Sequence, residues 1–289
     1  IRDGAHVFVG SACATPRTLL RALEGRDPAG IELIHFLTDG AVGERDGRAV
    51  SSFRHVAFYL GRDMLGLALS GGVHYVPMSL SEVPRLLENH RLAFDVALVQ
   101  VSPPDDAGMC SLGVSVDITR AAVLAARHVI AEINPAMPRT GPQSEVPFDR
   151  FDEIVAVDEP VIEYLHAPLV PTAEQIARYV ARIIEDGATL QIGLGRVPNE
   201  MLRFLVERRD LGIHSDVITE PLVDLVERGI VTGARKSVHK GQIVASMAMG
   251  TRRLYDLIDG NPQITLCPGE FVGDPAIIGG KRGMFSESL

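Results

Sequence analysis

The residues DGATLQIGLGRVPNE, positions 186–200, indicate the architecture of the whole chain. They comprise a turn at 186–187, an apolar strand over 188–192, a glycine loop at 193–196 and a helix expected from Pro198 onward. This succession is the repeating unit of α/β proteins with parallel sheets. Backbone N–H groups and the helix dipole converge at such a loop, which therefore suits an anion, although a tight turn needs the same small residues. A dinucleotide-binding fingerprint is incomplete, because Pro198 stands where a third glycine belongs.

The same alternation of short apolar strands and helices continues through the chain, which predicts largely parallel sheets covered on both faces. The expected strands are Ala5–Val9, Ile31–Leu37, Phe94–Val101, His128–Ile133, Ala188–Ile192, Gly212–Ile218, Gln242–Met247 and Gln263–Cys267. The expected helices are Pro16–Leu23, Val83–Leu87, Asp117–Arg127, Thr172–Glu185, Pro198–Glu207, Pro221–Arg228 and Leu254–Ile258.

Sequence signals at the helix ends and between the helices refine this prediction. Thr15, Ser79 and Thr172 are the expected N-cap side chains of the first, second and fourth helices. Aliphatic side chains at helical spacing predict the buried face of Thr172–Glu185, namely Ile176, Val180, Ile183 and Ile184. The irregular segment 158–171 suggests a domain boundary, which gives two α/β domains over 1–170 and 171–289.

The composition excludes several functional classes. A formal net charge of −9 leaves no basic surface for nucleic acid. The chain contains no apolar run of about 18 residues, the length of a membrane span, and its N-terminus has no signal-peptide pattern. The 3 cysteines lie far apart and suit a reducing compartment. The 9 histidines lack metal-ligand spacing, so no metal site is expected.

Two carboxylates follow the glycine loop in the next strand-to-helix unit. Asp216 lies near the carboxyl end of the expected strand Gly212–Ile218, which is the edge where parallel sheets bind ligands. A carboxylate at this position can act as a nucleophile or a general base. Glu220 lies four residues later, at the start of the next helix, where the helix dipole alone also favours an acidic residue.

Six segments, in order along the chain, carry recognisable patterns: Phe8–Cys13, Val101–Asp105 (VSPPD), Gly108–Gly113 (GMCSLG), Glu132–Pro138 (EINPAMP), Asp186–Gly195 (DGATLQIGLG) and Leu211–Leu225. Together they resemble the acetyl-CoA hydrolase/transferase family, which includes acetate and 4-hydroxybutyrate CoA-transferases. The resemblance implies two tandem CoA-transferase-type α/β domains and a cytoplasmic homodimer. It also implies acyl-CoA and a small carboxylate as substrates, with coenzyme A as the only cofactor-like molecule and neither a metal nor a redox group.

The resemblance further implies a ping-pong mechanism, in which a family glutamate attacks the thioester and then carries CoA. The residues matching the CoA and thioester site are Gln191, Gly193, Leu194, Gly195, Val197, Pro198 and the first-strand turn Gly10-Ser11. In this arrangement the loop supplies backbone donors to the developing oxyanion.

The chain departs from the family pattern in two ways. The catalytic glutamate of the family falls on Asp216, whose carboxylate is one methylene shorter and sits roughly 1.5 Å further back. The space left suits a water molecule, and Glu220 ranks second as a nucleophile. The family also continues beyond the segment matching residue 286, so the second domain is expected to be incomplete.

These observations favour a CoA-transferase with Asp216 as the covalent nucleophile. An acyl-CoA hydrolase with Asp216 as general base, an inactive acyl-CoA-binding module and a sugar-phosphate-binding protein remain as alternatives. Arg54, Arg62 and Arg196 are weaker candidates for pairing with a carboxylate. Cys110 is interpreted as a packing residue.

Overall fold

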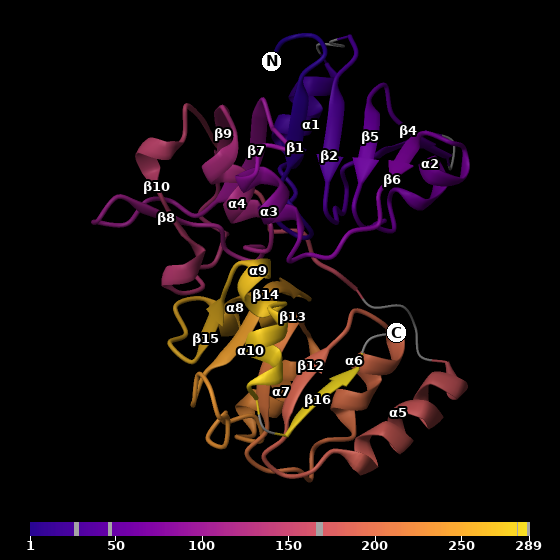
Figure 1. The fold of residues 1–289 in the computed structure, drawn as a ribbon, viewed down its shortest axis with the longest axis vertical. Coiled ribbons are helices and arrows are strands. Elements are labelled where there is room, and N and C mark those ends of the chain that lie inside the picture. Colours follow the sequence, from indigo (N-terminus) through magenta and orange to yellow (C-terminus); the bar gives the residue numbers. More distant parts are fainter. Residues whose placement is uncertain (26–28, 46–47, 166–169, 282, 288–289) are drawn as a thin grey trace.

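The structure is a computed structural model that describes residues 1–25, 29–45, 48–165, 170–281 and 283–287. Two twisted sheets dominate it, the first built before residue 157 and the second after residue 188 (Figure 1). The first has the order β11 (Glu153–Ala156), β9 (His128–Ile133), β7 (Val96–Val101), β1 (His6–Val9), β2 (Glu32–His35), β5 (Arg54–Ala57) and β6 (Val73–Tyr75). The second has the order β15 (Ile264–Leu266), β14 (Ile243–Met249), β13 (Gly212–Thr219), β12 (Thr189–Ile192) and β16 (Met284–Glu287).

All strand pairs within these two sheets are parallel, as predicted. Two antiparallel pairs stand apart: β3 (Gly43–Arg45) with β4 (Arg48–Val50), and β8 (Met109–Ser111) with β10 (Glu145–Pro147). The helices are α1 (Arg17–Glu24), α2 (Leu65–Leu69), α3 (Val83–Glu88), α4 (Thr119–Ala125), α5 (Pro171–Ile183), α6 (Arg196–Arg203), α7 (Pro221–Glu227), α8 (Arg252–Ile258), α9 (Gly269–Val272) and α10 (Pro275–Gly279). Two short 3₁₀ turns cover Pro142–Ser144 and Phe148–Arg150.

Each sheet is built outward in both directions from its first strand. β2, β5 and β6 extend one side of β1 while β7, β9 and β11 extend the other; β13, β14 and β15 lie on one side of β12 and β16 on the other. Ligands of parallel sheets bind at the carboxyl ends of strands where the order reverses. The strand order reverses at β1 and at β12. The segments Gly10-Ser11 and Gly193–Gly195, which directly follow these two strands, therefore lie where a ligand is expected.

The predicted N-caps are wrong for α1, α3 and α5, which lack a side-chain capping bond. The Thr15 and Ser79 hydroxyls bond within their own turns instead. Helix α5 begins at Pro171, which places Thr172 inside its first turn. Proline occupies one of the first two positions of α3 and α5, where its fixed φ favours helix entry and its missing N–H needs no cap.

The predicted buried face of α5 is correct for two of its four residues. Ile184 is buried and Val180 packs half-buried against the core, whereas Ile176 and Ile183 are 41% and 65% exposed and the buried positions within the helix are Ala173, Ala177 and Ala181. Helix α5 packs on α6, and small side chains on that face allow the two backbones to come close. The large aliphatic residues alone therefore did not identify the face that packs on α6.

The segment that follows β8 joins the two sheets. It pairs antiparallel with β14: the Val116 N–H donates to the Ser246 carbonyl at 3.0 Å, and the Ala248 N–H donates to the Val114 carbonyl at 2.8 Å. The Asp117 carboxylate next to it is fully buried and accepts bonds from the Ser11, Ser115 and Thr119 hydroxyls. Its backbone carbonyl accepts from Gly269 of α9. One hydrophobic core accordingly runs through both halves of the chain, and the boundary near residue 170 stays a prediction.

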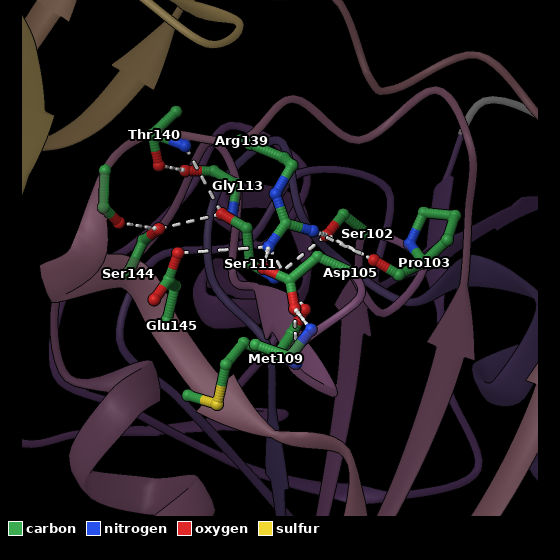
Figure 2. A network of polar contacts seen from close by, with 12 residues as sticks. Ser102, Pro103, Asp105, Met109, Ser111, Gly113, Arg139, Thr140, Ser144 and Glu145 are labelled. Carbon is green, nitrogen blue, oxygen red and sulfur yellow. Dashed lines mark hydrogen bonds and ion pairs between the residues drawn. The ribbon is translucent and has the colours of Figure 1, made fainter. Parts of the chain in front are cut away.

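Arg139 holds the VSPPD and GMCSLG segments together (Figure 2). Its guanidinium donates to the Ser102 hydroxyl at 3.1 Å, to the Pro103 and Met109 carbonyls at 3.0 and 3.1 Å, and to the Asp105 carboxylate at 2.7 Å. These contacts fix the two segments that lead to the strand-like segment paired with β14.

We expect Arg139→Ala to lower the free energy of unfolding by about 2 kcal/mol, because it removes four hydrogen bonds, one of them charge-assisted to Asp105, although the three other acceptors keep a second donor. Urea denaturation followed by circular dichroism measures the change. The control is Arg127→Ala, which removes an exposed arginine with one long ion pair and is expected to change stability by less than about 0.5 kcal/mol. Equal effects of the two substitutions would contradict this role for Arg139.

Candidate active site

Asp216 lies in a cavity of about 460 Å³ between the two sheets. Its side chain is half-buried near the carboxyl end of β13, as the sequence predicts. The second half of the chain supplies one wall of the cavity and the first half supplies the other. The lining residues are Phe36, Leu37, Tyr59, Met78, Ser79, Leu80, Gly193, Leu194, Asp216, Val217, Met247 and Met249.

The glycine loop and Gln191 bring the predicted site residues of the second half together. Because β12 and β13 are neighbours, the loop after β12 lies beside Asp216, and Gly193 and Leu194 line the same cavity. The Gln191 amide donates to the Asp216 carboxylate at 3.4 Å. Gly195 precedes α6 and lines an adjoining cavity with Leu194. The loop and Asp216 therefore lie together as expected from the sequence, while the thioester site around them stays a prediction.

Burial controls the charge of Asp216. Loss of hydration raises the pKa of its carboxyl, and the bond from Gln191 partly opposes this rise. The cavity contains no lysine, arginine or histidine among its lining residues, so nothing on its walls neutralises the carboxylate. An ionised carboxylate with little hydration and no counter-ion is a stronger nucleophile or base than one in water.

The adjoining cavity, of about 170 Å³, shares Leu37, Tyr59, Leu194 and Met249 with the first. It contains two of the arginines named from the sequence. Arg62 is already engaged, because it pairs with Asp39 at 3.0 Å and lies 3.9 Å above the Tyr164 ring. Arg196 is exposed at the start of α6 and faces this space. Arg54 lies at the opposite, amino-terminal end of its strand.

The other predicted site residues lie outside the lining of both cavities. Ser11 is fully buried and bonded to Asp117, and Gly10 packs against the backbone of residues 14 and 98. Val197 and Pro198 are buried in the first turn of α6. Substrate contacts for these four residues stay predictions.

Glu220 is held away from Asp216 by the backbone. Its carboxylate accepts the Thr251 N–H at 2.8 Å at the start of α8. A Cβ at Gly250 would lie 2.8 Å from the same carboxylate oxygen, so the glycine makes room for this contact. The arrangement ties α7 to α8, and of the two carboxylates only Asp216 is among the lining residues of the cavity.

Sequence reasoning missed the apolar wall from the first half of the chain. Phe36 and Leu37 follow β2, Tyr59 follows β5, and Met78 and Leu80 follow β6. A signal was available for Phe36 and Leu37, which end an expected strand at the edge of the sheet where ligands bind. None was available for Tyr59, Met78 and Leu80, because β5 and β6 were not expected from the sequence. The buried Cys110 fits its expected packing role, since burial raises the pKa of its thiol to about 11.

Within the described residues, no group of three or more His, Cys, Asp or Glu side chains is arranged to hold a metal ion. The helices in that part of the chain are too short or too polar to cross a bilayer.

Comparison with known proteins decides the family. The acetyl-CoA hydrolase/transferase N-terminal domain matches residues 1–166. The chain belongs to the acetyl-CoA hydrolase/transferase family. Among curated members, it is 37% identical over 281 residues to the 4-hydroxybutyrate coenzyme A transferase of Clostridium kluyveri. It is 34% identical over 283 residues to the succinyl-CoA:acetate/propanoyl-CoA:succinate CoA transferase of Fasciola hepatica.

The match covers 96% of this chain in both cases but 65% and 59% of those two relatives. The chain thus spans about three-fifths of the length of these family members. Among solved structures, RipA from Yersinia pestis superposes with a TM-score of 0.90 at 32% identity, covering 99% of this chain and 70% of RipA. The fold is therefore the CoA-transferase fold that the sequence predicts.

The burial of Asp216 has a measurable consequence for stability. The pKa of the Asp216 carboxyl in the folded protein lies above its ordinary value of 3.8. The folded state therefore binds this proton more tightly than the unfolded chain does. Ionisation therefore costs stability as the pH rises above 3.8. We expect Asp216→Asn, which cannot ionise, to melt at a higher temperature than the wild type at pH 7, with the difference shrinking towards pH 4.

Thermal denaturation followed by circular dichroism across this pH range measures the effect. The matched control is Asp106→Asn at an exposed position, which is expected to leave the melting temperature unchanged. A lower melting temperature for Asp216→Asn at pH 7 would show that the carboxylate is stabilised in the cavity rather than strained there.

Proposed function

We propose that this protein is a CoA-transferase that moves CoA between a short-chain acyl-CoA and a small carboxylate, with Asp216 as the covalent nucleophile. The observation that carries the proposal is the half-buried Asp216 carboxylate in a cavity beside the Gly193–Gly195 loop. The named activities of the relatives support it, since both are CoA transferases.

In the proposed reaction the Asp216 carboxylate attacks the thioester carbonyl and CoA thiolate leaves, which gives a mixed anhydride. The thiolate then attacks the aspartyl carbonyl of the anhydride, which releases the first carboxylate and leaves CoA as a thioester on Asp216. The acceptor carboxylate reverses both steps. The backbone N–H groups of the loop would stabilise the developing oxyanion.

A second candidate function is acyl-CoA hydrolysis, and the observation that favours it is aspartate in place of the family glutamate. The shorter side chain leaves space for a water molecule between carboxylate and thioester. Asp216 would then act as a general base, and no covalent intermediate would form. An inactive acyl-CoA-binding module is the third possibility, since misplacing a reactive group by about 1 Å costs on the order of 100-fold in rate.

In this proposal CoA is a substrate, and the reaction needs neither a metal nor a redox group. The protein is further proposed to be cytoplasmic and to form a homodimer. The lack of a strong counter-charge at Asp216 supports direct nucleophilic chemistry, because the thioester itself provides the activated bond. Arg196, exposed at the adjoining cavity, is placed to meet an anionic part of the substrate.

The walls of the cavity also support a substrate class. Three methionines, Met78, Met247 and Met249, line it together with leucine and aromatic side chains. Methionine adapts to groups of different shape, so uncharged acyl chains of several sizes fit this lining. A dicarboxylic acyl group would bury its second carboxylate there without a partner.

The transfer reaction is tested by incubating the protein with acetyl-CoA, with and without propionate, and separating the thioesters by chromatography. We expect propionyl-CoA to form only when propionate is present, and Asp216→Ala to abolish its formation. Glu220→Gln is the matched control and should retain most of the activity, since its amide oxygen still accepts the Thr251 N–H.

Free CoA released regardless of propionate would establish hydrolysis instead. Tight binding of CoA without any turnover would favour the inactive module. Full activity of Asp216→Ala would exclude Asp216 as the nucleophile and would leave Glu220 as the remaining candidate.

The acyl preference is tested by comparing butyryl-CoA and succinyl-CoA as donors with the same acetate acceptor. Because the terminal carboxylate of succinyl-CoA meets no cation on the cavity wall, we expect its kcat/KM to be lower by at least about tenfold. Equal values for the two donors would show that another group, such as Arg196, reaches the second carboxylate.

A further inference from the structure

The strands β12 and β13 part from each other just before the glycine loop and Asp216. Their backbone register ends at the pair Leu190 and Ile213. The outer partners of both strands continue beyond this point, because β12 pairs with β16 through Ile192 and β13 pairs with β14 through Thr219. The separation is therefore confined to the space between these two strands, at the edge of the Asp216 cavity.

The hydroxyl of Ser215 bridges the two strands where their backbone pairing stops. An unbroken parallel ladder in this register would carry the Ile192 N–H to the His214 carbonyl. The Ile192 N–H instead donates to the Ser215 hydroxyl at 2.9 Å, and that hydroxyl donates to the Ile192 carbonyl at 2.8 Å. Ser215 is fully buried. Its side chain accordingly acts as a wedge that fixes the distance between the two strands.

A second buried hydroxyl ties the other end of the glycine loop to the same strand. Thr219 donates to the side-chain oxygen of Asn199 at 2.6 Å, and Asn199 lies in the first turn of α6. The Asn199 N–H in turn donates to the Gly195 carbonyl at 3.3 Å. Thr219 is 1% and Asn199 7% exposed. The loop is therefore attached to β13 through Ile192 before it and through Asn199 after it.

These two attachments flank Asp216 on its own strand. Ser215 directly precedes Asp216, and Thr219 lies three residues after it. One direct contact also crosses the gap, from the Gln191 amide to the Asp216 carboxylate, but at 3.4 Å it is long for a hydrogen bond. The two buried hydroxyls therefore fix the separation between the loop and Asp216 more tightly than this direct contact does.

We propose that Ser215 and Thr219 are positioning residues for the reaction at Asp216. Their hydroxyls hold the backbone N–H groups of the loop and the Asp216 carboxylate at the spacing at which both reach one carbonyl group. The inference rests on the proposed function, and it applies equally to transfer and to hydrolysis. Both reactions need the carboxylate and the oxyanion donors on the same carbonyl.

The two hydroxyls act through the loop and not on the substrate. Ser215 and Thr219 are buried and are not among the residues that line the Asp216 cavity or the adjoining one. Their contribution is to geometry, and a displacement of about 1 Å at a reacting group costs on the order of 100-fold in rate.

Substitutions that each remove one hydroxyl test the proposal. Thr219→Val keeps the size and branching of the side chain, and Ser215→Ala removes a single oxygen atom. With acetyl-CoA and propionate, or with acetyl-CoA alone if the wild type hydrolyses it, we expect each to lower kcat by at least about tenfold while KM for acetyl-CoA changes by less than about threefold. Thr219→Ser and Ser215→Thr, which keep a hydroxyl, are expected to retain most of the wild-type kcat.

The matched control is Ser144→Ala. Ser144 is also fully buried, and its hydroxyl donates to the Gly141 carbonyl at 2.7 Å, but it is not among the residues that line the Asp216 cavity. Its loss is expected to lower the melting temperature without altering kcat. A merely structural role for Ser215 and Thr219 would give this same pattern.

The bridge between the strands is also measurable without turnover. Selective ¹⁵N labelling of isoleucine gives an NMR signal for the Ile192 amide, and hydrogen exchange reports how firmly that amide is bonded. We expect slow exchange in the wild type and exchange at least about tenfold faster in Ser215→Ala. Ile34, in the middle of the first sheet between β1 and β5, is the internal control and should keep its rate.

Three results would overturn the proposal, and they are distinguishable. A wild type that neither transfers nor hydrolyses acyl-CoA would refute the proposed function, and the positioning role with it. An active wild type whose kcat survives in both Ser215→Ala and Thr219→Val would refute the positioning role alone. An Ile192 amide that exchanges in the wild type as fast as an exposed amide would exclude the bridge, and this measurement needs no variant to fold.

Discussion

The pairing of the segment after β8 with β14 is the constraint on which the rest of the structure depends. Hydrogen bonds between Val114, Val116 and β14 join the two sheets through their backbones, and the buried Asp117 carboxylate fixes the segment from behind. The pairing involves residues 246–248, near the carboxyl end of β14. It accordingly holds the residues that follow β2, β5 and β6 beside Asp216 of β13. The apolar wall above Asp216 exists only when the sheets are held in this way.

The proposed chemistry depends on how burial affects the charge of Asp216. No cation stands among the residues that line its cavity, and the raised pKa of its carboxyl reflects lost hydration. Strongly perturbed carboxyl groups of this kind are concentrated at functional sites.

The sequence predicted the features that depend on local pattern and strand order. The strands β1, β2, β7, β9 and β12 to β15, the loop after β12 and the position of Asp216 followed from apolar runs, glycines and the geometry of parallel sheets. It failed where tertiary packing decides the outcome. The alanine face of α5 is buried because α6 approaches closely. The short strand β5 and the edge strand β6 form because a neighbouring strand offers its backbone.

The central claim is that Asp216 carries CoA covalently, and mass spectrometry of the intact protein after incubation with acyl-CoA tests it most directly. The account predicts an added mass equal to CoA minus water, located by peptide mapping to the segment that contains Asp216 and absent in Asp216→Asn. Turnover of acyl-CoA with no adduct, under conditions in which thioesters survive, would contradict the covalent mechanism and support a general-base hydrolase. An adduct on Glu220 would contradict the assignment of the nucleophile.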